Sequence, residues 1–255
     1  MNKNKPFCVV QISDCHLYSA VNAIHYGANV YHNLCLVLDE IAARGDVDCI
    51  IFTGDLSQDH SEASYQLFVQ AFEHSNITVP VYYLAGNHDD PQLLSQFLTN
   101  TPFNSSSFVD NAHWQVMLLD SKSATPAGEI TRESIQRLDQ TLNPAKYQLL
   151  MMHHHAIDVG YFIDRHGLTN ADTFWQCVDK YPSIKGVACG HVHRGLTLSP
   201  EQTTKKIAVY TCPATSIEFD PNIDGVSSTG KGPGYRIFHL CEQGNIETSI
   251  RYIEK

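Results

Sequence analysis

The feature that most constrains the fold is a pattern found at five places, where an apolar segment stops at a group of polar side chains. In residues 81–90, an apolar, β-branched and aromatic run typical of a buried strand ends in Gly86, Asn87, His88 and Asp89. The same pattern closes the segments 11–16, 53–55, 152–155 and 189–193. Because α/β proteins place their binding groups at the carboxyl ends of strands, we expect these five strand ends to form one site.

Segments with strand character alternate with segments of helical periodicity through most of the chain. We expect strands at residues 7–13, 47–53, 79–85, 114–120, 147–152 and 184–189. We expect helices from residue 31 to Gly45, after an N-cap at Asp59, at residues 91–98 and 131–142, and after an N-cap at Asn170. Residues 103–108, which contain a run of serines, are expected to form a surface loop.

The pattern changes after residue 193. Four more strands, at residues 196–198, 207–211, 235–240 and 246–253, follow one another without helices between them. Strand-helix alternation followed by consecutive strands predicts an α/β fold of two packed sheets flanked by helices. The chain shows no linker or low-complexity tract, so we expect a single domain over residues 1–255.

Composition argues against several classes of function. The formal net charge of −10 argues against a nucleic acid polymer as the main ligand, because neutralising a phosphate backbone needs clustered Lys and Arg. The longest apolar runs are far too short for a membrane span, and the start MNKNKPF holds no apolar run that could serve as a signal peptide. The eight cysteines lack CxxC spacing, so we expect no disulfide framework and a cytoplasmic location.

The polar groups at the strand ends are those of a metal site. One Asp-x-His or one Gly-His-x-His is a weak signal, but five such ends in a fixed order are a strong one. Carboxylates, an amide oxygen and imidazoles without thiolates favour Mn, Fe or Zn in a catalytic role. Seven ligands are more than one ion needs, so we expect two ions bridged by a carboxylate. Two such ions could act together in a nucleophilic attack on phosphorus.

The order of the motifs, Asp-x-His, Gly-Asp, Gly-Asn-His-Asp, His and Gly-His-x-His, resembles that of the calcineurin-like metallophosphoesterase superfamily from Gln11 to His193. The surrounding sequence resembles the bacterial class III 3′,5′-cyclic-AMP phosphodiesterases of the Icc type. The segments that carry this likeness include GDLSQD at 54–59, LLDS at 118–121, LTNA at 168–171, PAT at 213–215 and PGYR at 233–236. The resemblance implies a four-layer α/β/β/α sandwich of two mixed sheets flanked by helices.

The resemblance also implies how the ligands are shared between the two ions. It implies Asp14, His16 and His193 on one ion; Asn87, one histidine of the triplet 153–155 and His191 on the other; and Asp55 bridging. We favour His153, the first residue after the strand, and keep His154 as the alternative. The residue after the triplet is Ala156 where the family commonly has Pro, so the backbone path is less closely defined by the resemblance at this point.

The resemblance assigns the catalytic and substrate-binding roles as well. His88 is expected to be the acid or transition-state stabiliser, with Asp89 as its orienting partner. The substrate phosphate is expected to contact Asn87, His88, His16 and Asp55. Two loops, at residues 19–31 and 213–234, are expected to select the rest of the substrate, and their candidate contacts are His25, Asn29 and Phe219.

The sequence therefore favours a cytoplasmic phosphodiesterase with two metal ions (Fe, Mn or Zn) that opens the 3′,5′-cyclic phosphate of cAMP to give 5′-AMP. One alternative is a related enzyme acting on glycerophosphodiesters or other nucleotide phosphoesters with the same centre. Another is a non-catalytic scaffold on the same fold. This is disfavoured, because a scaffold has no need for seven metal ligands together with His88.

Overall fold

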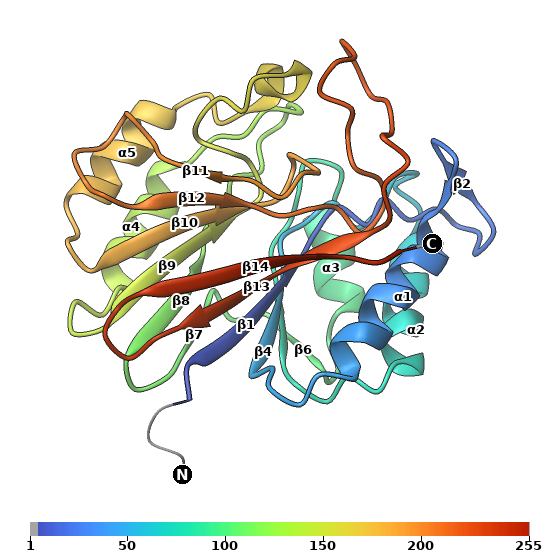
Figure 1. Cartoon of the computed structure of the whole chain (residues 1–255), viewed down its shortest axis with the longest axis horizontal. Helices are drawn as coiled ribbons and strands as arrows, with labels where there is room; N and C mark the ends of the chain where they lie inside the picture. The colour runs from blue at the N-terminus through green and yellow to red at the C-terminus, as the bar shows by residue number, and fades with distance from the viewer. Residues whose placement is uncertain (1–4, 255) are drawn as a thin grey trace.

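The computed structural model describes residues 5–254, so most of the polar N-terminal stretch on which the signal-peptide expectation rests lies outside the described residues. Two six-stranded sheets pack face to face at the centre of the molecule (Figure 1). The first sheet has the order β14 (Ile246–Tyr252), β13 (Gly234–Leu240), β1 (Phe7–Ile12), β4 (Cys49–Phe52), β5 (Val81–Tyr83) and β6 (Phe103–Asn104). Strands β1, β4, β5 and β6 run parallel, whereas β13 and β14 are antiparallel to their neighbours.

The second sheet is also mixed. Its order is β11 (Thr197–Leu198), β12 (Ala208–Thr211), β10 (Ile184–Cys189), β9 (Tyr147–Met152), β8 (Trp114–Leu118) and β7 (Phe108–Asp110). Strands β8, β9, β10 and β12 are parallel, and β7 and β11 run antiparallel at the two edges. The central parallel strands β1, β4, β9 and β10 are buried along almost their whole length, because both of their faces are covered.

Helices cover the two outer faces. The helices α1 (Val30–Ala42), α2 (Glu62–His74) and α3 (Pro91–Phe97) share an apolar core with the first sheet. The helices α4 (Arg132–Thr141) and α5 (Ala171–Asp179) do the same for the second sheet. A third core, which includes Val9, Ile51, Val116, Leu149 and Phe238, fills the space between the sheets. The expected four-layer α/β/β/α sandwich is therefore confirmed.

Several local expectations were wrong. Residues 103–108 contain the edge strand β6 and the start of β7, which are too short and too polar to show a strand pattern in the sequence. The N-cap of α2 is Ser61, whose hydroxyl accepts from Ser64 N, while Asp59 accepts from Ser61 N and Oγ. Asn170 precedes α5, but its side chain hydrogen-bonds the backbone of Ile130 instead of capping the helix.

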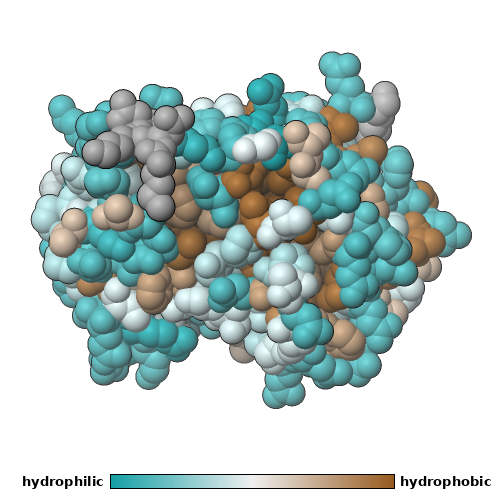
Figure 2. Space-filling model, turned by 90° about the horizontal axis from the view of Figure 1, so that it is seen from below, coloured by the Kyte–Doolittle hydropathy of each residue, from teal (hydrophilic) through white to brown (hydrophobic). Residues whose placement is uncertain are grey.

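The loop at residues 19–31 also has structure of its own. It contains a short hairpin of β2 (Ile24–His25) and β3 (Ala28–Asn29), and the later single-turn helix η1 (Phe162–His166) is another short element. None of the described helices is long and apolar enough to cross a membrane. Figure 2 shows a mainly hydrophilic face, with hydrophobic side chains gathered in a depression near its middle.

Arg236 ties the two sheets together at the antiparallel edge. Its side chain is buried on β13 and donates to the carbonyl oxygens of Thr211 and Leu196 and to the hydroxyl of Thr248. Replacing it, Arg236→Met, removes all three hydrogen bonds, although Leu196 O still accepts from the backbone N–H of Thr211. We expect the free energy of unfolding to fall by about 2–4 kcal/mol.

Urea denaturation followed by circular dichroism measures this loss. Arg251→Met, at an exposed position of the neighbouring strand β14, is the matched control and should change stability by less than about 0.5 kcal/mol. An Arg236→Met variant as stable as the parent protein would show that these three hydrogen bonds contribute nothing net.

Candidate metal centre

The five polar strand ends meet at one edge of the sandwich. Strands β1, β4 and β5 lie side by side in the first sheet, and β9 and β10 lie side by side in the second. Their carboxyl ends bring together side chains from positions far apart in the sequence. The candidate ligands gathered there, all of them at least partly buried, are Asp14, His16, Asp55, Asn87, His153, His191 and His193.

The first group of donor atoms surrounds His16 and His193. Their Nε2 atoms face each other at 3.1 Å. Asp14 Oδ1 lies 3.5 Å from His193 Nε2, and Asp55 Oδ2 lies 3.7 Å from His16 Nε2. Four side chains from strands β1, β4 and β10 thus direct one atom each toward a common point.

The second group surrounds His153. Its Nε2 lies 3.0 Å from Asn87 Oδ1, 3.1 Å from His191 Nδ1 and 3.3 Å from Asp55 Oδ2. The same oxygen of Asp55 therefore faces both groups. This is the position that a carboxylate shared by two cations must occupy.

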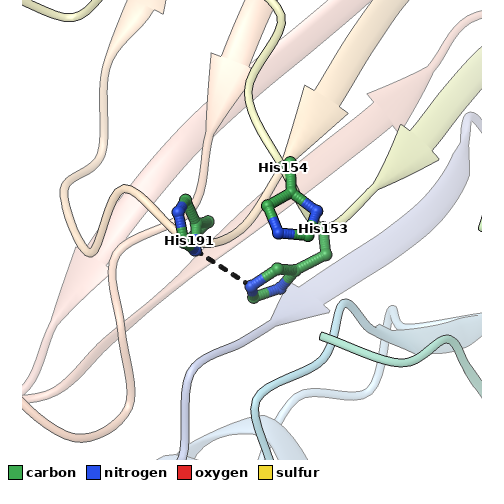
Figure 3. A group of neighbouring side chains, drawn as sticks. All are labelled: His153, His154 and His191. Atoms are coloured by element: carbon green, nitrogen blue, oxygen red, sulfur yellow. Dashed lines mark hydrogen bonds between the residues drawn. The ribbon is translucent and has the colours of Figure 1, made fainter. Parts of the chain in front are cut away.

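The three histidines of the triplet 153–155 have different hydrogen-bond partners. Figure 3 shows the rings of His153 and His191 joined by a hydrogen bond, with the ring of His154 beside them. His154 is close enough to count with them as a possible three-ligand cluster. However, its Nδ1 pairs with Ser121 Oγ and its Nε2 with Pro126 O. His155 pairs with Asp164 instead. Of the triplet, His153 alone points toward both Asn87 and Asp55.

Hydrogen bonds fix the ring orientation of three histidines. His153 Nδ1 donates to Thr53 O at 2.7 Å, and His193 Nδ1 donates to Ile217 O at 2.9 Å. His16 Nδ1 pairs with Gln58 Oε1 at 2.7 Å. Each of these contacts leaves Nε2 as the atom that faces the centre, which is the usual arrangement around metal-binding histidines. The sequence reasoning missed Gln58 in this role, although it lies within the quoted segment 54–59.

The backbone at the strand ends is strained. Five of the candidate ligands have positive φ angles: Asp14 (56°), His16 (47°), Asp55 (58°), His191 (64°) and His193 (57°). Such non-glycine conformations are uncommon and cluster at functional sites. The turns also approach each other closely, because a Cβ placed on Gly86 would lie 2.1 Å from Asp55 Oδ1.

The electrostatics of the cluster favour bound cations. Burial lowers the pKa of His193 to about 3 and holds the pKa values of His16 and His191 well below their usual range. Burial also opposes protonation of His153, but the carboxylates of Asp55 and Asp14 outweigh it and raise its pKa to about 9. The two carboxylates thus favour positive charge at His153, while burial disfavours protonation of the other three imidazoles.

The donor atoms fit metal ions in detail. Ile217 O can only accept, so His193 Nδ1 carries the proton and its Nε2 presents a lone pair to His16 Nε2. Two neutral imidazole nitrogens at this separation, with two buried carboxylates beside them, form a suitable set for a divalent cation. In the second group, Thr53 O likewise receives the Nδ1 proton of His153, whose Nε2 faces His191 Nδ1, Asn87 Oδ1 and Asp55 Oδ2.

His88 and Asp89 do not form the expected pair. The carboxylate of Asp89 accepts from the backbone N–H groups of Gly86, Asp55 and Leu56. It therefore holds the two strand-end turns together, and its expected role as the partner of His88 is wrong. The His88 backbone N–H donates to Asp55 Oδ1, and its ring packs edge-on against His16 at 5.0 Å between centroids.

A pocket of about 350 Å³ opens from the centre. His16, Asp55, Asn87 and His88 line it together with His25, as expected, and Phe219 also reaches it. Asn29 is not among the lining residues, and its side chain caps α1 by accepting from His32 N, so its expected substrate contact stays a prediction. Among the further lining residues that the sequence reasoning missed, four have apolar side chains that carried no distinguishing pattern: Phe162, Ile163, Pro126 and Val226.

Comparison with known proteins agrees with this geometry. A family profile described as calcineurin-like phosphoesterase matches residues 8–195. A protein of Colwellia psychrerythraea named "probable cyclic nucleotide phosphodiesterase" is 51% identical over 97% of this chain and 95% of its own length. The "3′,5′-cyclic adenosine monophosphate phosphodiesterase CpdA" of Vibrio vulnificus is 33% identical over 95% of this chain and 89% of its own.

A solved structure shares the fold. The dimetal phosphatase from Danio rerio superposes with a TM-score of 0.69 over 97% of this chain and 96% of that one, at 14% identity. At this identity the likeness concerns the fold alone. The family profile covers more than half of the chain, and the Colwellia and Vibrio relatives match almost its full length. The chain therefore belongs to the calcineurin-like phosphoesterase family.

Proposed function

We propose that this protein is a metal-dependent phosphodiesterase that hydrolyses 3′,5′-cyclic AMP to 5′-AMP. Membership of the phosphoesterase family and the names of the full-length relatives support this proposal. The observation that carries it is the pair of donor groups that share Asp55 Oδ2. Such a pair suits two cations acting together on one phosphate.

In this proposal each cation is held by four side chains. One is held by Asp14, His16, His193 and Asp55, and the other by Asn87, His153, His191 and Asp55. When bound, two such cations, Fe, Mn or Zn, lower the pKa of water and polarise the phosphoryl oxygens. The carbonyls of Thr53 and Ile217 keep two of the histidine rings in the required tautomer.

His88 is the residue best placed to handle the leaving oxygen. Its ring lines the pocket beside His16, and its backbone is fixed at both ends of the residue: the N–H donates to Asp55, and the carbonyl pairs with His60 Nδ1. His88 Nδ1 is buried and makes no hydrogen bond with the described residues. In this proposal the ring, which lines the pocket, donates a proton to the 3′ oxygen as the cyclic ester opens.

The lining of the pocket favours a nucleotide over a glycerophosphodiester. Away from the polar centre the wall is formed by Phe162, Ile163 and Phe219. A glycerol group offers little apolar surface to such a wall, whereas a nucleobase offers a flat one. A scaffold role would leave seven gathered donor atoms without a purpose.

A turnover panel with the Mn-loaded protein tests the proposal. The substrates are cAMP, cGMP, 2′,3′-cyclic nucleotides and glycerophosphodiesters, with the products identified by chromatography. We expect the highest kcat/KM for cAMP and 5′-AMP as its product. A higher kcat/KM for a glycerophosphodiester would overturn the assignment of the substrate. If no phosphodiester were hydrolysed, the assignment of the protein as an enzyme would be overturned.

Phe219 is expected to affect all substrates alike. The sequence suggested that Phe219→Ala would weaken cAMP turnover selectively, but the ring stacks on His193 at 3.7 Å between centroids and 8° between planes. Its loss should let a candidate ligand shift. We expect turnover of cAMP and of bis(p-nitrophenyl) phosphate to fall together by roughly 10- to 100-fold, measured side by side. A loss of turnover confined to cAMP would show that Phe219 acts selectively on the nucleotide substrate.

A further inference from the structure

The pocket has two chemically different ends. One end holds donor groups of the metal centre, and the remaining wall includes the apolar side chains of Phe162, Ile163, Phe219 and Val226. In the described part of the chain, the large hydrophobic side chains classed as exposed all lie on the two loops beside this mouth: Val21, Ile24, Tyr26, Ile223 and Val226. Figure 1 shows the β2 loop and the loop that precedes β13 projecting from the body of the molecule.

Two of these five side chains line the pocket. Tyr26 is 55% exposed and Val226 is 41% exposed, and both belong to its wall. Ile24 and Ile223, on the same two loops and with similar exposure, do not line it. The mouth therefore presents one apolar side chain from each loop.

Tyr26 is held in a conformation that its side chain disfavours. It closes the hairpin between the paired residues His25 and Ala28, with φ of 43°, and Gly27 follows with φ of 84°. Two-residue turns with two positive φ angles favour Asn-Gly, and a bulky aromatic residue there is an outlier. Strain of this kind persists where the side chain has a function.

The wall behind the mouth is continuous and apolar. Ala28 of the hairpin, Ile163 of η1, and Ile217 and Phe219 of the second loop form one buried cluster. Phe162 packs against this cluster, with its ring 5.1 Å from that of Phe219. Of these side chains, Phe162, Ile163 and Phe219 line the pocket, and the buried Ala28 and Ile217 pack behind them.

Two ring contacts connect the metal centre to Tyr26. His25 stacks parallel to His16 at 5.6 Å between centroids, and Tyr26 contacts His25 edge-on at 4.8 Å. The His16, His25 and Tyr26 side chains all line the same pocket, so a ligand bound at the centre can extend along His25 toward Tyr26.

We propose that Tyr26 and Val226 form a seat for the nucleobase and determine the preference of this enzyme for nucleotides over simpler phosphodiesters. This inference rests on the proposed function and adds the residues that select the substrate. The base stacks on the Tyr26 ring and packs against Val226, while its phosphate reaches the metal centre. Stacking a base on one aromatic side chain is sufficient for roughly a 10-fold gain in affinity.

The test is Tyr26→Asn, which removes the ring but keeps the turn, because Asn-Gly is the favoured pair at these positions. Two substrates are compared: cAMP and 1-O-methyl-ribose 3′,5′-cyclic phosphate, which has the same cyclic ester and no base. We expect kcat/KM for cAMP to fall about 10-fold, mainly through KM, with kcat/KM for the base-free ester unchanged. Val226→Ser should show the same selectivity with a smaller loss.

Matched controls lie on the same loops. Ile24→Ala and Ile223→Ser remove exposed apolar side chains that do not line the pocket, so both variants should match the parent on both substrates. If Tyr26→Asn lowered kcat/KM equally for the two substrates, Tyr26 would support the metal centre. If it lowered kcat/KM for neither, Tyr26 would not contact the base. Both results overturn the proposal.

A second readout separates this proposal from the proposed function. If the parent protein hydrolyses bis(p-nitrophenyl) phosphate but not cAMP, the assignment of the substrate fails. The seat is then tested by inhibition of that hydrolysis by 5′-AMP and by ribose 5-phosphate. A preference for 5′-AMP that Tyr26→Asn removes supports the seat, and an unchanged ratio of inhibition constants overturns it.

Discussion

Asp55→Ala is expected to abolish phosphodiester turnover and to lower the bound metal from two ions per chain to one or fewer. The Asp55 Oδ2 atom lies 3.3 Å from His153 Nε2 and 3.7 Å from His16 Nε2, so it belongs to both donor groups. Its other oxygen accepts from the backbone N–H of His88 at 2.9 Å. One substitution therefore removes the shared donor and releases the turn that carries His88.

Metal content by elemental analysis and turnover of bis(p-nitrophenyl) phosphate measure the two effects, and circular dichroism checks the fold. Asp120→Ala is the matched control, because Asp120 also follows a strand of the sandwich but is exposed and lies outside the pocket. It should keep both ions and full activity. Near-normal turnover by Asp55→Ala with two ions bound would show that Asp55 is not shared.

The fold and most of the candidate ligands could be predicted because both depend on local patterns. A buried strand followed by Gly-Asp or Gly-His-x-His fixes where each polar group lies relative to its sheet. The order of the elements then fixes which strand ends meet. The choice within the histidine triplet is not local in this sense. It depends on Thr53 O, which receives the His153 ring, and on Ser121 and Pro126, which hold His154.

Adjacent residues misled the sequence reasoning where contacts cross between elements. Asp89 follows His88, yet its carboxylate turns back to the N–H groups of Asp55 and Leu56 on another strand end. Asn29 is near the first ligand pair in the chain, but the start of α1 uses its side chain as a cap. Phe219 has the apolar character expected of a substrate contact, and only the structure shows the His193 ring against it.

The same limit applies to the two apolar side chains at the mouth of the pocket. Tyr26 and Val226 are isolated apolar residues in polar loops, which are common on any protein surface. Their significance comes from the way the hairpin and the loop at 213–234 lie on opposite sides of one cavity. The positive φ angle of Tyr26 is likewise a property of the folded chain that no sequence pattern predicts.

His88→Ala is expected to lower turnover by roughly 10²- to 10⁴-fold while leaving two ions bound. The ring lines the pocket and lies near His16 and Asp55, but the four side chains of each donor group stay in place without it. Removing a group that acts only in the transition state should lower kcat and kcat/KM alike. Steady-state kinetics with cAMP, together with metal analysis, measures this.

The structure offers a matched control in His60, whose ring stacks on His88 at 5.6 Å and whose Nδ1 pairs with the His88 carbonyl, but which is exposed and does not line the pocket. His60→Ala should cost no more than a few-fold, since the Asp55 contact still holds the His88 backbone. A p-nitrophenolate leaving group needs little help from an acid. The turnover of His88→Ala should therefore fall less with such a substrate than with cAMP. If His88→Ala instead lost a bound ion, or lost equally on both substrates, His88 would belong to the metal centre, and the proton for the 3′ oxygen would have to come from another group.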